Sequence, residues 1–219
     1  MKKKLLLCFT FIFICFSINF FKPYKHSFAE EKTVYLTFDD GPTKYVTDEI
    51  LDILEEHEVM ATFFVIGKMA NENQSVLKRI YNDGHTVALH GYSHEYKKIF
   101  SSPIELEKDI LKCIDTLENL LPEFKAQFFR FPGGSHKLSN RLKNVPKNLN
   151  LTTIDWNATI GDGEYNDGSV ETYKKEFLKT VKDKNKVVLL MHDTKKNTAK
   201  CLPYFIDYFI KNGYSFRKF

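Results

Sequence analysis

TVYLTFDDGP, residues 33–42, is the stretch that decides the fold. Its first six residues are rich in apolar and β-branched side chains and have the length of a buried strand, which a Gly-Pro pair then ends. Such a strand delivers Asp39 and Asp40 together to its carboxyl end. An Asp-Asp-Gly-Pro sequence alone is more typical of a turn than of a functional site. Whether Asp39 and Asp40 belong to a turn or to a functional site therefore depends on the rest of the chain.

The remainder of the chain alternates strand-length apolar runs with longer amphipathic segments. Strands are predicted at residues 33–38, 59–66, 85–90, 127–131, 151–156 and 186–192, with a short last strand at 214–217. Helices are predicted at residues 47–57, 73–81, 103–121, 138–145, 170–182 and 198–211, and Ser102 is the expected N-cap of the third. This alternation predicts one α/β domain in which helices cover a parallel sheet, either closed as a barrel or open.

Polar residues stand at the carboxyl ends of the predicted strands. Parallel α/β folds carry their chemistry at this end, so side chains from different strands meet at one rim. The six ionisable residues in question are Asp39 and Asp40 after the first strand, His90 after the third, Arg130 after the fourth, Asp162 beyond the fifth and His192 after the sixth. We expect them to form a single site.

Two histidines in the segment His-Gly-Tyr-Ser-His are candidate metal ligands. His90 and His94 are four residues apart, which places them on one face if the segment forms a helical turn. Although this spacing is common without metal, two histidines and one aspartate form a set that leaves a zinc position open for water. Asp39 and Asp40 are too close to ionise freely without cations, and a metal on one and Arg130 on the other would meet that need.

Two further segments fit the chemistry of hydrolysis. The glycines of Arg-Phe-Pro-Gly-Gly, residues 130–134, suit either a simple turn or a close approach of backbone N–H groups to an oxyanion. His192 ends an apolar strand, where a core histidine is the commoner role, but it could also protonate a leaving amine. The combined pattern indicates metal-assisted hydrolysis of an amide or an ester.

The N-terminus has the order of an export leader. Three lysines precede the uncharged apolar run 5–21, so residues 1–29 are expected to be a signal peptide or an N-terminal membrane anchor. We expect a catalytic domain at residues 30–219 that is exported, and is either secreted or held at the outer face of the cell membrane or cell wall. A membrane partner is expected only through that anchor.

Charge and cysteine content exclude several classes of protein. The leader holds five of the 32 Lys and Arg residues and no acid, which leaves 27 basic against 28 acidic residues. A nearly neutral domain lacks the basic footprint of a nucleic-acid-binding protein, so no such partner is expected. Only Cys113 and Cys201 lie beyond the leader, and we interpret them as buried free thiols rather than as a disulfide.

The chain resembles the polysaccharide deacetylases of carbohydrate esterase family 4 over residues 33–219. Five motifs occur in order, at residues 37–42, 90–94, 130–134, 155–162 and 190–192. The resemblance implies a distorted (β/α) barrel of about seven parallel strands in a single domain. It also implies one divalent metal ion, zinc before Co²⁺ or Ni²⁺, and the ligands that it implies are Asp40, His90 and His94.

The resemblance also implies an activity, the removal of N-acetyl groups from N-acetylglucosamine residues of a polysaccharide. Peptidoglycan is the preferred substrate because of the leader, and a chitin-like oligomer is the alternative. The implied roles are a general base at Asp39, an arginine that keeps it charged at Arg130, an oxyanion donor at the Gly133 N–H, an acid at His192, its partner Asp162, and an acetate-pocket wall at Leu190.

Two positions depart from the family pattern. Gly133 stands where many members have Tyr, and Gly163 stands where many have Trp, so both changes remove wall from the expected site. Trp156 falls within a predicted apolar strand, and we interpret it as a core aromatic. Two alternatives stay open, namely an esterase acting on acetylxylan or another O-acetyl glycan, and a catalytically dead glycan-binding homologue.

Overall fold

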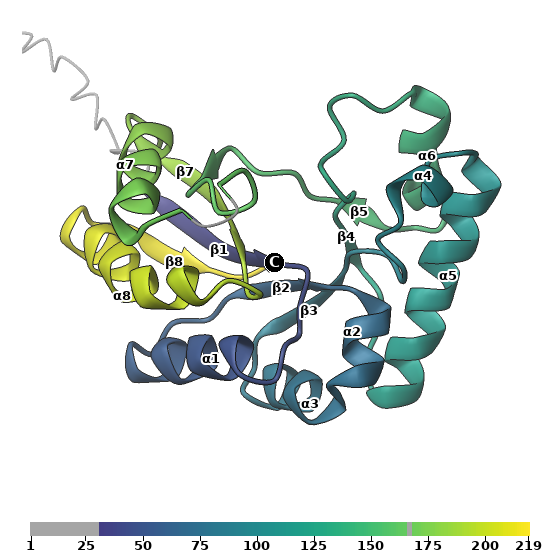
Figure 1. Cartoon of the computed structure of the whole chain (residues 1–219), viewed down its shortest axis with the longest axis horizontal. Coiled ribbons are helices and arrows are strands. Elements are labelled where there is room, and N and C mark those ends of the chain that lie inside the picture. The colour runs from purple at the N-terminus through teal and green to yellow at the C-terminus, as the bar shows by residue number, and fades with distance from the viewer. Residues whose placement is uncertain (1–30, 166–167) are drawn as a thin grey trace, which may run out of the picture.

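The computed structural model describes residues 31–165 and 168–219. A parallel β-sheet passes through the middle of the domain and helices cover it from outside (Figure 1). The strands are β1 (Thr33–Asp39), β2 (Thr62–Val65), β3 (Thr86–Leu89), β4 (Phe128–Phe129), β5 (Thr152–Thr153), β6 (Ala158–Thr159), β7 (Lys186–His192) and β8 (Ser215–Arg217). The predicted leader, residues 1–29, lies outside the described residues.

Every helix predicted from the sequence is present, with ends that differ by at most three residues. The helices are α1 (Val46–Glu56), α2 (Gly67–Glu72), α3 (Gln74–Asn82), α4 (Tyr96–Ile99), α5 (Pro103–Leu120), α6 (Asn140–Asn148), α7 (Val170–Val181) and α8 (Lys196–Lys211). The sequence did not predict α2 and α4, because helices this short do not display an amphipathic repeat. No helix in the described ranges has both the length and the apolar character needed to cross a membrane.

The sheet has the strand order β5-β4-β3-β2-β1-β7-β6, and β8 pairs with β1 beside this path. All pairs are parallel. β1 and β7 are in register over their whole length, from Thr33 opposite Lys186 to Asp39 opposite His192. Within the described residues the edge strands β5 and β6 form no ladder with each other, so the sheet is a curled half-barrel. The predicted distorted barrel of about seven parallel strands is confirmed.

The predicted strand at residues 151–156 is wrong in its second half. Only Thr152 and Thr153 pair with β4. The chain then crosses from one edge of the sheet to the other over residues 154–157, and β6 pairs with β7. A short apolar run cannot reveal which strand it pairs with, because that choice depends on contacts far away in the sequence.

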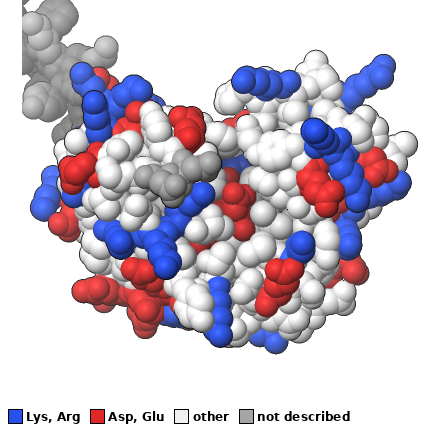
Figure 2. Space-filling model, viewed as in Figure 1, with Lys and Arg blue, Asp and Glu red and all other residues white. Residues whose placement is uncertain are grey.

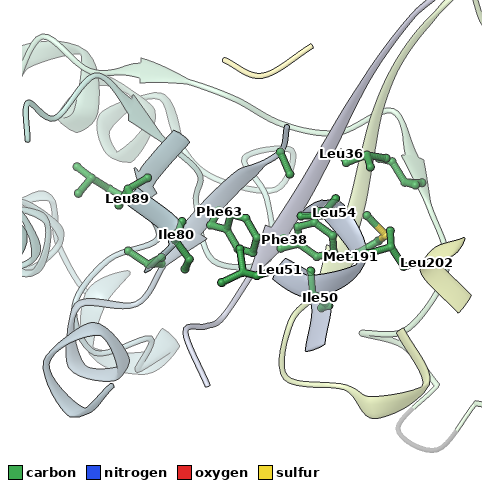
Figure 3. Packing of buried hydrophobic residues seen from close by; sticks show 14 of the residues in the cluster. Leu36, Phe38, Ile50, Leu51, Leu54, Phe63, Ile80, Leu89, Met191 and Leu202 are labelled. Carbon is green, nitrogen blue, oxygen red and sulfur yellow. The ribbon is translucent and has the colours of Figure 1, made fainter. Parts of the chain in front are cut away.

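The core holds the carboxyl half of β1 in place. Phe38 on β1 and Met191 on β7 face Ile50, Leu51 and Leu54 on α1 (Figure 3). All five side chains are at most 1% exposed, and burying a side chain of this size contributes about 1.5–3 kcal/mol. Asp39 directly follows Phe38 and is therefore presented from a rigid support.

The amino ends of the strands are closed by the C-terminal residues. Figure 1 shows the C-terminus in the middle of the molecule. The Phe219 N–H donates to Thr62 Oγ1 at 3.2 Å, and the Phe219 carbonyl accepts from Thr86 Oγ1 at 2.7 Å. The Phe219 ring stacks on Tyr35 with 4.5 Å between ring centroids. Phe219 thus covers part of this end of the sheet, whereas the carboxyl end carries the cavity described below.

Two smaller predictions are confirmed. Ser102 caps α5, since its side chain accepts from the Glu105 N–H at 3.2 Å. An N-cap of this kind stabilises a helix by roughly 1 kcal/mol. Cys113 and Cys201 are both buried and free.

Candidate active site

Asp40, His90 and His94 converge at the carboxyl rim of the sheet. Asp40 follows β1 and His90 follows β3. Asp40 Oδ1 lies 3.4 Å from His90 Nε2 and 3.2 Å from His94 Nε2. One ligand atom from each residue lies within 4.8 Å of the others. The structure thus brings together the three residues that the sequence analysis proposed as metal ligands.

The donor set fits a divalent cation. Asp40 Oδ1 is buried and has no hydrogen-bond partner, although two imidazole nitrogens face it. His90 Nδ1 lies 2.9 Å from the Arg130 carbonyl oxygen, which only accepts, so Nδ1 carries the proton and Nε2 keeps its lone pair. A carboxylate oxygen that faces an imidazole lone pair without a proton between them suits zinc and related metals.

The electrostatics of Asp40 and His94 agree with this interpretation. Burial would raise the pKa of Asp40, but the neighbouring His90, His94 and His192 hold it well below its usual range. Burial lowers the pKa of His94, against the opposing charge of Asp40. An ionised aspartate and a neutral imidazole are the protonation states that a metal requires of these ligands.

The segment between the two histidines is a loop and not a helical turn. Gly91 and His94 have positive φ angles of 81° and 59°, which an α-helix excludes. Asp109 on α5 holds this loop by accepting from the Tyr92 N–H at 2.7 Å and from the Ser93 N–H at 3.0 Å. The conditional expectation of a helical turn was therefore wrong, and tertiary contacts bring the two imidazoles together instead. Asp109 could not be singled out from the sequence, because nothing in its spacing distinguishes it from other acids on α5.

Asp39 and Arg130 form a buried ion pair beside the three convergent residues. Arg130 Nη1 donates to Asp39 Oδ1 at 2.7 Å and to Thr37 Oγ1 at 2.8 Å. Arg130 is fully buried, and its guanidinium lies 4.0 Å from the centroid of the Phe64 ring. Asp39 Oδ2 lies 3.7 Å from His90 Nε2. One oxygen of Asp39 is thus held by the arginine while the other faces the site.

His192, which is partly buried, and the buried Asp162 form a second pair at the same rim. Asp162 Oδ1 lies 2.8 Å from His192 Nδ1, and Asp162 Oδ2 accepts from the His192 N–H and from Thr198 Oγ1, both at 2.7 Å. Burial would lower the pKa of His192, but the hydrogen bond and charge of Asp162 raise it to about 9. Asp162 follows β6, a strand that the sequence did not predict, and the rim position expected for it is nevertheless correct.

The loop after β4 contains the two glycines of the Arg-Phe-Pro-Gly-Gly motif. Gly133 and Gly134 have positive φ angles of 71° and 82°. The Gly134 N–H donates to the Phe131 carbonyl at 2.8 Å, whereas the Gly133 N–H donates to no acceptor in the described part of the chain. Asp155 holds the next residue, since its carboxylate accepts from the Ser135 N–H at 3.1 Å and from the Ser135 hydroxyl. The loop is a turn whose first glycine keeps a free donor.

A cavity of about 210 Å³ joins these groups. Figure 2 shows acidic side chains in a hollow in the middle of the face it displays. The residues that line the cavity are Asp39, Asp40, His90, His94, Tyr96, Gly133, Trp156, Thr159, Gly163, Glu164, Leu190 and His192. Arg130 and Asp162 are buried behind it.

Trp156 and Tyr96 are part of this lining. Trp156 is only partly buried and lines the cavity, so its interpretation as a core aromatic was wrong. The error follows from the broken strand, because residues 154–157 cross between the sheet edges. Tyr96 begins α4, a four-residue helix without a sequence signature, so its place in the site could not be predicted from the sequence.

Asp193 is a further buried acid near the rim that the sequence analysis did not single out. It is 1% exposed, and Thr47 Oγ1 donates to its Oδ2 at 2.8 Å while Oδ1 has no partner. Burial raises the pKa of Asp193 to about 7, against the hydrogen bond from Thr47. A side chain at Gly41 would collide with this carboxyl, so Asp193 packs directly under the turn that follows Asp40.

Comparison with known proteins gives consistent matches. A family model described as polysaccharide deacetylase matches residues 27–154. The peptidoglycan-N-acetylglucosamine deacetylase PgdA of Listeria monocytogenes is 32% identical over 84% of this chain and 37% of its own length. A chitooligosaccharide deacetylase of Azorhizobium caulinodans is 30% identical over 74% of each chain. The solved catalytic domain of a peptidoglycan N-acetylglucosamine deacetylase from Eubacterium rectale is 32% identical, with a TM-score of 0.80 over 86% of this chain and 88% of that one. The chain spans 66% of a Bacillus subtilis relative, so some matches concern only part of the longer protein.

Proposed function

The chain belongs to the polysaccharide deacetylase family, and from that premise we propose that it removes N-acetyl groups from N-acetylglucosamine residues of peptidoglycan. The observation that carries the proposal is one cavity that receives Asp39, His192 and the convergent Asp40, His90 and His94. An acid, a base and a set of metal ligands at a single cavity are the groups that amide hydrolysis requires.

We propose Asp40, His90 and His94 as the ligands of one divalent metal ion, zinc before Co²⁺ or Ni²⁺. Bound there, such an ion supplies a Lewis acid for the acetyl carbonyl and lowers the pKa of an attacking water. The remaining chemistry falls to side chains and backbone groups of the chain itself.

Asp39 is the proposed general base. Its Oδ1 accepts from Arg130 at 2.7 Å, which leaves Oδ2 on the side of the site to take a proton from water. Arg130 is fully buried, so its charge acts on Asp39 at short range without screening by solvent. The pair therefore fixes the orientation of Asp39 with one oxygen turned toward the site.

The Gly133 N–H is the proposed oxyanion donor. It lies in the loop that borders the cavity, and among the described residues it has no acceptor. A fixed backbone donor stabilises the negative charge that develops on the acetyl oxygen, and the loss of one such donor typically costs about a hundredfold or more in turnover. Leu190, which is 7% exposed and lines the cavity, is the proposed wall of the acetate pocket.

His192 is the proposed acid for the leaving amine. Asp162 binds its Nδ1, so its Nε2 faces the cavity, 4.0 Å from Asp40 Oδ2. The raised pKa keeps the imidazole protonated at neutral pH, ready to donate to the sugar nitrogen as the C–N bond breaks. Asp162 holds the ring and stabilises its charge.

Peptidoglycan is preferred as substrate for two reasons. Relatives of similar sequence carry the name peptidoglycan-N-acetylglucosamine deacetylase. The N-terminal sequence has the order of an export leader, which would bring the enzyme to the cell wall. Secretion or anchoring at the outer membrane face belongs to this proposal, and detecting the protein outside protoplasts or on their surface tests it.

Product analysis tests the function. The zinc-loaded chain is incubated with purified peptidoglycan, chitin oligomers and acetylxylan, and released acetate and product masses are measured. Acetate from peptidoglycan with conversion of N-acetylglucosamine to glucosamine is expected. Acetate from acetylxylan alone would make the chain an O-acetyl esterase. Glycan binding without acetate from any substrate would make it a dead homologue, which the filled set of site positions does not favour.

A further inference from the structure

Tyr96 is a half-exposed aromatic side chain at the entrance of the cavity. It is 46% exposed and lines the cavity together with the proposed metal ligands. Its ring lies edge-on to His94, with centroids 5.0 Å apart and an interplanar angle of 90°. On its other side it lies edge-on to Phe100, 5.9 Å away. These two rings hold Tyr96 in one orientation although nearly half of it faces solvent.

The two consecutive glycines of the neighbouring loop make room for two aromatic rings. A Cβ atom on Gly133 would lie 3.0 Å from Tyr96 Cε1 and 3.2 Å from its hydroxyl oxygen. A Cβ atom on Gly134 would lie 2.9 Å from the Trp156 ring. Each contact is closer than side chains tolerate without a shift. The wall that Gly133 lacks is therefore supplied by Tyr96, from a helix distant from Gly133 in the sequence.

Rings in this position suit a sugar. Tyr96 and Trp156 border the cavity beside Gly133, whose free N–H is the proposed oxyanion donor. An aromatic ring offers a rigid apolar surface that can cover the C–H face of a pyranose, and the tyrosine hydroxyl can donate a hydrogen bond to the same sugar. The acetyl group would then reach the Gly133 N–H only when the sugar lies against the rings.

We propose that Tyr96 is a substrate-contacting residue that replaces the missing side chain of Gly133 as the wall of the sugar subsite. This inference rests on the proposed function and adds to it the group that recognises the acetylated sugar. Trp156 forms the companion wall. Tyr96 thereby sets the affinity for the glycan while the base, the acid and the metal ligands set the rate.

Steady-state kinetics of the zinc-loaded chain with chitin oligomers tests the proposal. Tyr96→Ala should raise KM roughly tenfold and change kcat much less, as expected for the loss of one aromatic contact. Tyr96→Phe should fall between Tyr96→Ala and wild type. Leu111→Ala is the matched control, because Leu111 is also 46% exposed but lies on α5 and does not line the cavity. Its KM should stay at the wild-type value.

Zinc affinity, measured by calorimetry, separates this role from support of His94. The proposal predicts that zinc affinity is unchanged in Tyr96→Ala. A weaker zinc affinity with an unchanged KM would overturn the proposal and make Tyr96 a support of the ligand. Absence of acetate release by the wild type would instead count against the proposed function. In that case binding of chitin oligomers to the wild type and to Tyr96→Ala is compared by calorimetry, and equal affinities would overturn the inference as well.

A double-mutant cycle tests the contact between Tyr96 and Gly133. Gly133→Ala should raise KM in the wild-type background, because the new Cβ pushes Tyr96 out of place. It should raise KM much less in Tyr96→Ala, where the ring is absent. Additive effects on KM would contradict the coupling of the two residues. Thermal unfolding of each variant shows whether strain at the positive φ angle has affected the fold.

Discussion

The two ends of the parallel sheet differ in how their polar groups are paired. At the amino end, the polar groups of Thr62 and Thr86 are hydrogen-bonded to Phe219, and the aromatic ring of Phe219 covers Tyr35. At the carboxyl end, buried polar atoms remain without partners. In the described residues the buried side-chain atoms that lack a hydrogen-bond partner are Asp40 Oδ1, Arg130 Nη2 and Asp193 Oδ1, and all three belong to the carboxyl end.

Two histidines, one at each end of the sheet, show the same contrast. His85, at the amino end, accepts from the Ala61 N–H at 3.2 Å, and burial lowers its pKa to about 4, so it is neutral. His192, at the carboxyl end, is paired with Asp162, which raises its pKa to about 9 against the effect of burial. The amino end holds a neutral histidine, whereas the carboxyl end gathers buried charges and a shifted pKa, a combination that clusters at functional sites.

The largest effect at the carboxyl end is expected from removing a proposed metal ligand. His94→Ala should abolish zinc binding and reduce acetate release by roughly a thousandfold or more, because the Lewis acid is lost. Metal analysis after dialysis and an acetate assay measure both effects. Full activity of this variant in a chelator would disprove the metal-assisted mechanism.

Asp39→Asn should distinguish the roles of the two adjacent aspartates. We expect turnover to fall about 10²–10⁴-fold, because the general base is lost, while zinc remains bound with little change in affinity. The corresponding change Asp40→Asn is the control and should weaken zinc binding. If Asp39→Asn lost the metal and Asp40→Asn kept it, the roles of the two residues would be reversed.

Asp162→Asn should change the pH dependence of turnover. Burial lowers the pKa of His192, whereas the hydrogen bond and charge of Asp162, together with the charges of Asp39 and Asp40, raise it, so without Asp162 that pKa should fall from about 9 toward its ordinary value of 6.5. The alkaline limb of the pH–rate profile should then move to lower pH, and turnover at pH 8 should fall by up to about thirtyfold. The stability of the fold should also depend on pH through this pair. The pair stabilises the fold fully below pH 6.5 and loses this effect as the pH rises through about 9, so the variant should be more destabilised at pH 6 than at pH 10. An unshifted alkaline limb would argue against His192 as the acid.

The smallest effects are expected from removing hydrogen bonds of a single side chain at each end of the sheet, Asp109 at the carboxyl end and Thr86 at the amino end. Asp109→Ala leaves the Tyr92 and Ser93 N–H groups unpaired, so it should lower the melting temperature and weaken zinc binding about tenfold. Thr86→Val removes the hydrogen bond to Phe219 at the amino end and should lower the melting temperature without changing zinc affinity. Equal zinc affinities in the two variants would show that Asp109 does not position the loop between His90 and His94.

Much of this arrangement could be predicted from the chain alone. The alternation of strand-length and helix-length segments gave the parallel sheet, and parallel strands place their carboxyl ends at one rim. That rule was sufficient to bring Asp39, Asp40, His90, Arg130 and His192 together. Their catalytic and binding roles remain predictions that the variants above test.

Other features depended on contacts between distant segments. The split of the predicted strand at 151–156, the loop between the two histidines and the placement of Tyr96 over Gly133 leave no periodic pattern in the sequence. Asp109 likewise looks like any acid on an exposed helix until its carboxylate is seen against two backbone N–H groups. Hydrophobic periodicity reports which face of a segment is buried, and so the sequence determined the sheet and the residues at its carboxyl rim. Which groups meet across that rim is set by packing between segments, and only the tertiary structure decided it.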